Sequence, residues 1–112
     1  MNATDRWLRD YVGAFNHGAE TGDFRAFLRL FAPDAVLTFD GVRLGPFEGR
    51  AAIGAAYRRF PPDDEIEILD SKVVDGEVVA GYSWLRTPDV RSGELRIRLN
   101  DDGLAQTVEI DV

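Results

Sequence analysis

The hydrophobic period of the sequence changes near residue 65, and this change constrains the fold more than any other feature. Before residue 61, apolar side chains recur every three or four positions, as they do along one side of an amphipathic helix. From Glu65 onward, apolar and polar residues alternate, as they do in a strand with one buried side. Helices first and strands later is the order of an α+β fold. We therefore expect helices that pack on a sheet formed largely by the second half of the chain.

The apolar spacing predicts three helices: one from the N-terminus to Gly18, one over residues 24–31 and one over residues 49–59. Asn2 or Thr4 is expected to cap the first helix, and Gly18 to end it. The second helix stops before Pro33, because a residue that precedes proline disfavours helical geometry.

The alternating pattern predicts strands over residues 35–39, 65–74, 77–87, 94–99 and 104–112, with a further short strand within residues 42–47. Asp-Gly pairs at residues 40–41 and 75–76 are typical of tight turns, so neighbouring strands of the meander are expected to pair antiparallel. The alternation breaks at Ile68 and Leu69, which indicates a β-bulge or a strand covered on both sides.

The composition argues against several functions. A net charge of -7 argues against non-specific nucleic-acid binding, which needs a basic surface. The chain has no Cys and a single His, His17, so we expect neither a metal site nor a thiol nucleophile. No signal-peptide pattern opens the chain, and no apolar run is long enough to span a membrane. We expect one cytoplasmic domain over residues 1–112, with no cofactor and with no nucleic-acid or membrane partner.

Three segments resemble the nuclear transport factor 2-like superfamily, which includes SnoaL-like and ketosteroid isomerase-like proteins. FAPDAV at residues 31–36 resembles the entry into the first strand of that superfamily. FEGRAAI at residues 47–53, followed by Tyr57, resembles its third helix, and DGLAQT at residues 102–107 resembles its last hairpin. The resemblance implies an α+β fold in which three N-terminal helices pack on a curved mixed, mainly antiparallel sheet, forming a cone with an apolar pocket. It also implies a homodimer formed through the sheet.

A cone of this kind encloses a pocket between the sheet and the helices, and we expect a small hydrophobic molecule to bind there. The bulky side chains expected to line it are Tyr11, Phe15, Leu37, Phe39, Tyr57, Tyr82, Trp84 and Leu95.

The resemblance to ketosteroid isomerases assigns candidate catalytic roles to Asp40, Tyr11 and Tyr57. Those enzymes combine a carboxylate base with an oxyanion hole made by a Tyr and a protonated acid. Here Phe39 occupies the base position, with Asp40 one residue later, and Leu95 occupies the position of the acid. A shift of one residue in a strand turns a side chain to the opposite face, so Asp40 points away from the pocket unless a bulge redirects it.

Three functions fit this pattern. The preferred hypothesis is a SnoaL-like protein that binds a small apolar ligand in a degenerate ketosteroid isomerase-type pocket. The first alternative is an acid–base enzyme of the isomerase or cyclase type that acts on a small hydrophobic carbonyl compound, with Asp40 as base and the two tyrosines as donors. The second is a non-catalytic dimerisation module. Glu67 is the other carboxylate whose orientation the sequence leaves open, and His17 is either a partner of the helix dipole or a proton shuttle at the pocket mouth.

Overall fold

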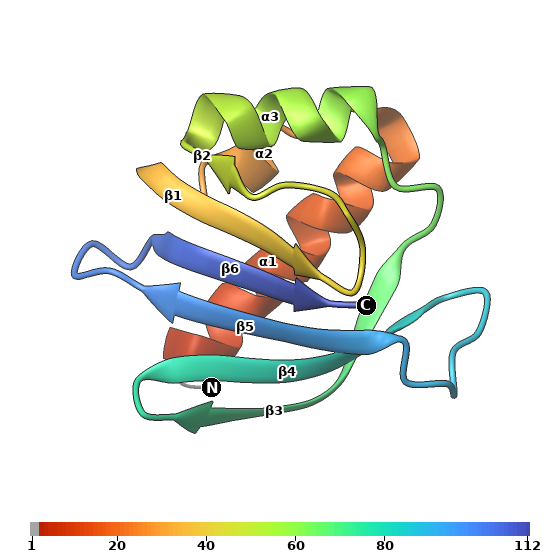
Figure 1. Cartoon of the computed structure of the whole chain (residues 1–112). Helices are drawn as coiled ribbons and strands as arrows, with labels where there is room; N and C mark the ends of the chain where they lie inside the picture. Colours follow the sequence, from red (N-terminus) through yellow and green to blue (C-terminus); the bar gives the residue numbers. More distant parts are fainter. Residues whose placement is uncertain (1–2) are drawn as a thin grey trace.

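The computed structural model describes residues 3–112, and its elements follow the change of period (Figure 1). Within these residues they are, in chain order, α1 (Ala3–Thr21), α2 (Arg25–Leu28), β1 (Phe31–Asp40), β2 (Phe47–Glu48), α3 (Arg50–Arg59), β3 (Ile66–Val74), β4 (Glu77–Trp84), β5 (Gly93–Leu99) and β6 (Ala105–Asp111).

The strands form one sheet in the order β2-β1-β6-β5-β4-β3. β1 and β6 run parallel, with Phe39 opposite Ile110, and all other neighbours are antiparallel. The prediction of an α+β fold with helices on a mixed, mainly antiparallel sheet is therefore confirmed. Because β6 returns to pair with β1, the two halves of the chain share one sheet.

The helices lie on one side of this sheet (Figure 1). A cluster of aromatic rings joins them to it. Phe27 of α2 is fully buried at the centre of the cluster. Its ring lies 5.1 Å from that of Tyr11 on α1 and 5.0 Å from that of Tyr57 on α3, measured between centroids. Since aromatic pairs at these distances attract each other beyond their area burial, the cluster fixes how the three helices sit over the sheet.

The first helix ends later than the sequence predicts, because Gly18 has a packing role there. The ring of Phe24 lies where a Cβ of Gly18 would stand, so only glycine allows this close approach. The helix continues to Thr21 and ends at Gly22, whose φ of +81° is the left-handed conformation of a helix C-terminus. Thr4 lies inside the helix rather than at its cap, and Asn2 lies outside the described residues.

The predicted bulge in the strand over residues 65–74 is confirmed. The register between β3 and β4 shifts between Ile68 and Asp70, which leaves Leu69 as the extra residue. An Asp70 Oδ1 oxygen accepts a hydrogen bond from the Gly81 N–H at 3.2 Å and holds the irregular stretch to its neighbour. The strand predicted over residues 77–87 ends at Trp84, where the loop to β5 begins.

Two polar side chains fix the helices to the strands that flank the interior. The Asn16 amide donates to the Ile66 carbonyl at 2.9 Å, and the Ile66 N–H donates back to Asn16 Oδ1 at 2.8 Å. Arg50 Nε donates to the Phe31 carbonyl at 3.1 Å. The first pair ties α1 to the start of β3, and the second ties α3 to the start of β1.

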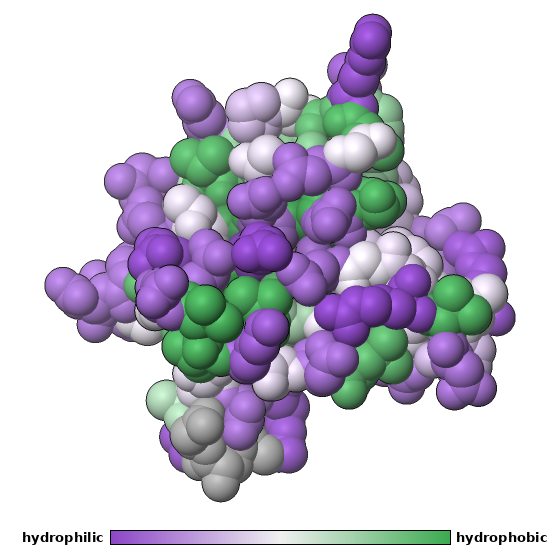
Figure 2. Space-filling view, turned by 60° about the horizontal axis from the view of Figure 1, so that its bottom comes forward, coloured by the Kyte–Doolittle hydropathy of each residue, from purple (hydrophilic) through white to green (hydrophobic). Residues whose placement is uncertain are grey.

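The surface on the β3 side is largely hydrophilic. Figure 2 shows separate hydrophobic patches there, and the exposed apolar residues of β3 are Leu69, Val73 and Val74. None of the helices within residues 3–112 combines the length and the hydropathy that crossing a membrane requires.

Candidate functional site

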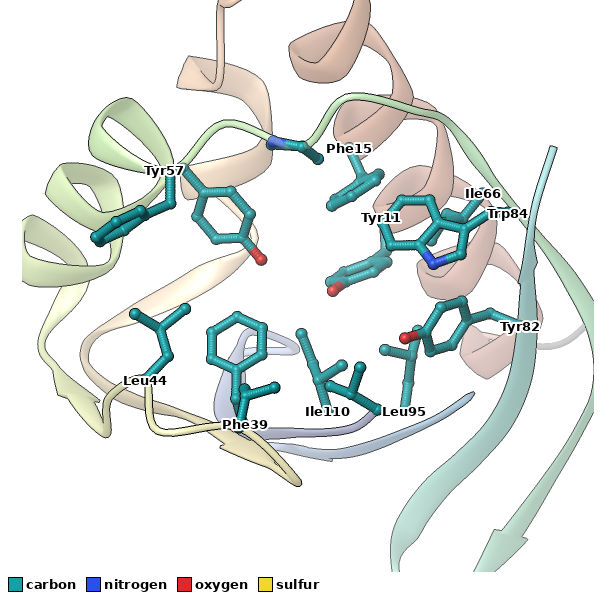
Figure 3. A pocket seen from close by; sticks show the side chains of 14 residues that line it. Tyr11, Phe15, Phe39, Leu44, Tyr57, Ile66, Tyr82, Trp84, Leu95 and Ile110 are labelled. Atoms are coloured by element: carbon teal, nitrogen blue, oxygen red, sulfur yellow. The ribbon is translucent and has the colours of Figure 1, made fainter. Parts of the chain in front are cut away.

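A cavity of about 260 Å³ lies between the inner face of the sheet and the helices (Figure 3). Its walls come from α1, α3, the five strands β1, β3, β4, β5 and β6, the loops that follow β1 and α3, and Val112. The lining residues are Tyr11, Phe15, Phe39, Val42, Leu44, Tyr57, Phe60, Pro62, Ile66, Tyr82, Trp84, Leu95, Ile110 and Val112. Every one of them is apolar or aromatic, so the cavity suits a hydrophobic molecule.

The structure brings most of the residues expected at the pocket to this cavity. Those that line it are Tyr11, Phe15, Phe39, Tyr57, Tyr82, Trp84 and Leu95. Leu37 does not line it: this residue is fully buried in the core, on the same strand face as Phe39. The sequence also places Ile110 on the inner face, but not at the cavity. It reaches the cavity because β6 pairs with β1 and β5 in a register that sets Ile110 opposite Phe39 and Leu95.

Three tyrosines supply the polar groups of the cavity. Figure 3 shows the hydroxyl groups of Tyr11, Tyr57 and Tyr82 pointing into it from α1, α3 and β4. The residues themselves are buried, with at most 6% of their surface exposed. None of the three hydroxyls has a hydrogen-bond partner among residues 3–112. They are therefore available to a ligand.

The phenols remain protonated at neutral pH. Burial raises the pKa of Tyr11 well above its ordinary value, and the nearby Tyr57 and Tyr82 raise it further. Burial likewise raises the pKa of Tyr57, with a smaller contribution from Tyr82. The pKa of Tyr82 is raised by burial and by the Asp111 carboxylate. A protonated phenol can donate a hydrogen bond, so the cavity presents three donors to an oxygen acceptor.

The candidate carboxylates lie outside the cavity. Asp40 is exposed, and its side chain interacts with that of Glu109 on the outer face of the sheet, which raises the pKa of Glu109. Glu67 Oε1 lies 3.2 Å from the Ser83 hydroxyl oxygen, away from the cavity lining. Among residues 3–112, no acid, imidazole or amine lines the cavity. The structure thus brings Tyr11 and Tyr57 together but leaves Asp40 on the opposite face, as its position in the strand requires.

The remaining titratable candidate is also remote from the cavity. His17 is exposed on α1 and is not among the lining residues. In the described part of the chain, no three His, Cys, Asp or Glu side chains are grouped so that they could hold a metal ion.

The helical layer, the mixed sheet and the apolar cavity between them form an α+β fold that is similar to solved SnoaL-like and nuclear transport factor 2-like structures. The chain belongs to the SnoaL-like domain family, whose sequence model matches residues 8–105. No protein of curated function matches the sequence significantly.

Solved structures with the same fold are numerous. A SnoaL-like protein from Burkholderia thailandensis is similar with a TM-score of 0.74 and 18% identity, over 96% of this chain and 92% of that one. RV0760c from Mycobacterium tuberculosis, solved with estradiol-17β-hemisuccinate, has a TM-score of 0.72 and 15% identity, over 98% and 93% of the two chains. A protein from Sinorhizobium meliloti provisionally named a polyketide cyclase has a TM-score of 0.61 and 26% identity, over 98% and 99%.

Proposed function

We propose that this protein binds a small hydrophobic compound that carries a carbonyl or a similar oxygen acceptor, and that it does so without transforming the compound. The observation that carries the proposal is the set of three unpartnered phenol hydroxyls in an otherwise apolar cavity. The hydroxyls are not among the fully buried polar atoms of the described residues, so each is reached from the open space of the cavity. A ligand oxygen placed there can accept a hydrogen bond from them, with a net contribution of about 1 kcal/mol for each bond.

The size of the cavity limits the ligand. Its volume of about 260 Å³ is just below the roughly 300 Å³ at which cavities for drug-sized ligands begin. A compound of one or two rings fits this space, and the rings of Phe15, Phe39 and Trp84 give it flat apolar walls. The complex of RV0760c with a steroid ester supports the idea that this fold accommodates hydrophobic ring systems.

Binding without chemistry is favoured over catalysis because the cavity lacks a base. A general base must approach within about 3 Å of the proton that it removes. Asp40, the candidate for that role, interacts with Glu109 on the outer face, whereas the neighbouring Phe39 lines the cavity. The phenols alone can bind a carbonyl oxygen, but they cannot abstract a proton while their pKa values are raised.

Calorimetric titration with 1-tetralone and with tetralin tests the proposal, because the two compounds share a ring system and differ in one carbonyl group. We expect saturable binding of both, with 1-tetralone about fivefold tighter, since one hydrogen bond contributes about 1 kcal/mol. Trp84→Ala should abolish binding by removing a wall. Glu109→Gln, on the outer face, is the matched control and should leave both affinities unchanged. No binding of either compound would overturn the proposal.

Deuterium exchange separates binding from acid–base catalysis. An enzyme of the isomerase type would speed the exchange of the protons next to the carbonyl of 1-tetralone in heavy water. We expect the exchange rate, followed by NMR, to equal the rate without protein. An accelerated rate that Asp40→Asn removes would establish the acid–base alternative instead.

A homodimer through the outer face of the sheet is a second element of the proposal. The outer face carries Glu77, Glu94, Arg96 and Arg98, and charges of both signs allow such a face to pair with a second copy of itself about a twofold axis. Sedimentation equilibrium should give the mass of two chains, falling towards one chain in Arg96→Glu. A monomer at high concentration would refute the dimer and leave the ligand proposal untouched.

A further inference from the structure

The arginines of this protein fall into two groups that differ in their partners. The outer-face arginines and those of the loop before β5 are bound to carboxylates: Arg96 lies 2.9 Å from Glu94, and Arg91 lies 2.9 Å from Asp70. By contrast, Arg43 and Arg59 are exposed, and neither forms an ion pair with any other described residue. Other arginines, such as Arg29 and Arg58, also form no ion pair with the described residues, so Arg43 and Arg59 are set apart by their position beside the cavity.

Arg43 and Arg59 belong to the segments that surround the opening of the cavity. The lining residues Val42, Phe60 and Val112 are 48%, 52% and 59% exposed, so the cavity opens to solvent where they lie. Arg43 directly follows Val42, and the Arg59 guanidinium lies 5.4 Å from the ring centroid of Phe60. Arg59 is therefore held against one wall of the mouth by a cation–π contact.

The carboxylates near the mouth are directed elsewhere. Asp63 and Asp64, which follow the loop after α3, are bound to Arg86 at 2.7 and 3.2 Å. Asp40 interacts with Glu109 on the outer face. The Asp111 carboxylate is near Tyr82 and raises the pKa of its phenol. None of these carboxylates pairs with Arg59 or Arg43, so the two guanidinium groups remain available to a ligand anion at the mouth.

Provided that the cavity binds a ligand as proposed above, we infer that this ligand is an amphipathic acid. Its apolar ring system occupies the cavity, and its carboxylate or other anionic group remains at the mouth, where Arg59 and Arg43 pair with it. The donors at the two ends differ in kind: phenols, which suit a neutral oxygen acceptor, lie inside, and guanidinium groups, which suit a carboxylate, lie outside. The inference fixes both the charge of the ligand and the direction in which it enters.

Titration with 4-(2-naphthyl)butanoate and with its methyl ester tests this inference, since the two compounds share the apolar part and differ in charge. We expect the anion to bind about threefold more tightly at low salt, because an exposed ion pair changes an affinity by a factor of about 1.4 to 5. High salt should reduce the preference, because both partners are exposed to solvent. Arg59→Gln should reduce the preference for the anion over the ester, and the double variant with Arg59→Gln and Arg43→Gln should remove this preference.

Arg98→Gln is the matched control, because Arg98 lies on the outer face at the end of β5 that is remote from the cavity. It should keep the full preference for the anion. Equal affinities of anion and ester in the unaltered protein would overturn this inference, while their binding would still support the proposed function. A preference that survives in the double variant would overturn the role of the two arginines. If neither compound binds, both the inference and the proposed function fail.

Discussion

The two faces of the sheet carry opposite chemistry although the same strands supply both. On the inner face, Phe39, Leu95 and Ile110 line the cavity. Their immediate neighbours Asp40 and Glu109 face outward with Arg96, which pairs with Glu94 and Glu77. Because successive side chains of a strand point to opposite sides, one residue separates an apolar wall from an ionic surface. The inner face is therefore apolar, whereas the outer face carries opposite-charge pairs around Arg96 and one pair of carboxyl groups, Asp40 and Glu109.

This comparison also explains why the isomerase resemblance yields a cavity without a base. Tyr11 and Tyr57, which the resemblance proposes as phenol donors, line the cavity. Asp40 follows Phe39, the residue at the position that the resemblance gives to the base, and it lies on the outer face beside Glu109. One position along a strand is enough to keep a carboxylate out of the cavity.

Truncating two adjacent residues of β5, one on each face of the sheet, should give the largest difference in the free energy of unfolding. Ile97 is fully buried, so Ile97→Ala is expected to lower the free energy of unfolding by about 3 kcal/mol through lost burial and the cavity left behind. Arg98 is exposed and lies 4.0 Å from Glu77, so Arg98→Ala should cost less than about 0.5 kcal/mol. Denaturant unfolding measures both, and similar losses at the two positions would contradict the contrast between the faces.

Removing the hydroxyl of a cavity tyrosine should change the free energy of unfolding less than Ile97→Ala does, and should not lower it. Removing a paired buried hydroxyl normally destabilises a protein, but the hydroxyl of Tyr57 has no described partner. Tyr57→Phe should therefore leave the free energy of unfolding unchanged or raise it by up to about 1 kcal/mol, and should weaken the preference for 1-tetralone over tetralin. Ser83→Ala is a suitable control, because the buried Ser83 hydroxyl donates to the Pro88 carbonyl at 2.9 Å. That control should lose stability; a loss of the same size in Tyr57→Phe would show that its hydroxyl is paired.

The order of the elements could be predicted because it depends on local patterns. The change of period at residue 65 separates helices from strands, and the broken alternation at Ile68 and Leu69 locates the bulge. The end of α1 was misplaced because a glycine that admits the ring of Phe24 is identical in sequence to a glycine that ends a helix. Only the close approach of Phe24 to Gly18, a contact between two elements, distinguishes the two roles.

The site could be predicted only in part, for a similar reason. Alternation shows which face of the sheet a residue is on, but not whether the residue lies at the cavity or in the packed core. Leu37 and Phe39 share a face and were both expected at the cavity, but Leu37 lies in the core. The mouth residues Val42, Leu44 and Val112 lie outside regular periodic segments, and no pattern marks them. The placement of loops over a cavity depends on the whole fold.

The smallest expected effect concerns the carboxyl groups of the outer face. Glu109 shares a hydrogen bond with Asp40, and this interaction with partial burial raises the pKa of Glu109 above its ordinary value of 4.5. A carboxyl group whose pKa is raised on folding stabilises the protein while it is protonated, and this contribution is lost as the pH rises through the raised pKa. At neutral pH the two carboxylates therefore repel each other. Glu109→Gln should raise the free energy of unfolding at pH 7 by a few tenths of a kcal/mol, roughly the scale of exposed pairs.

The expected change in the free energy of unfolding is small, but it can be tested because it depends on the pH and because a carboxyl group paired with arginine should give the opposite sign. At a pH near 4 the side chain of Glu109 is already protonated, so Glu109→Gln should change little there. Glu94 lies on the same face but pairs with Arg91 at 3.1 Å and with Arg96 at 2.9 Å. Glu94→Gln should therefore lower stability at pH 7 by a similar amount. If both variants shift stability in the same direction at pH 7, Glu109 is not held beside Asp40, and the contrast between a like-charge pair and opposite-charge pairs on the outer face does not hold.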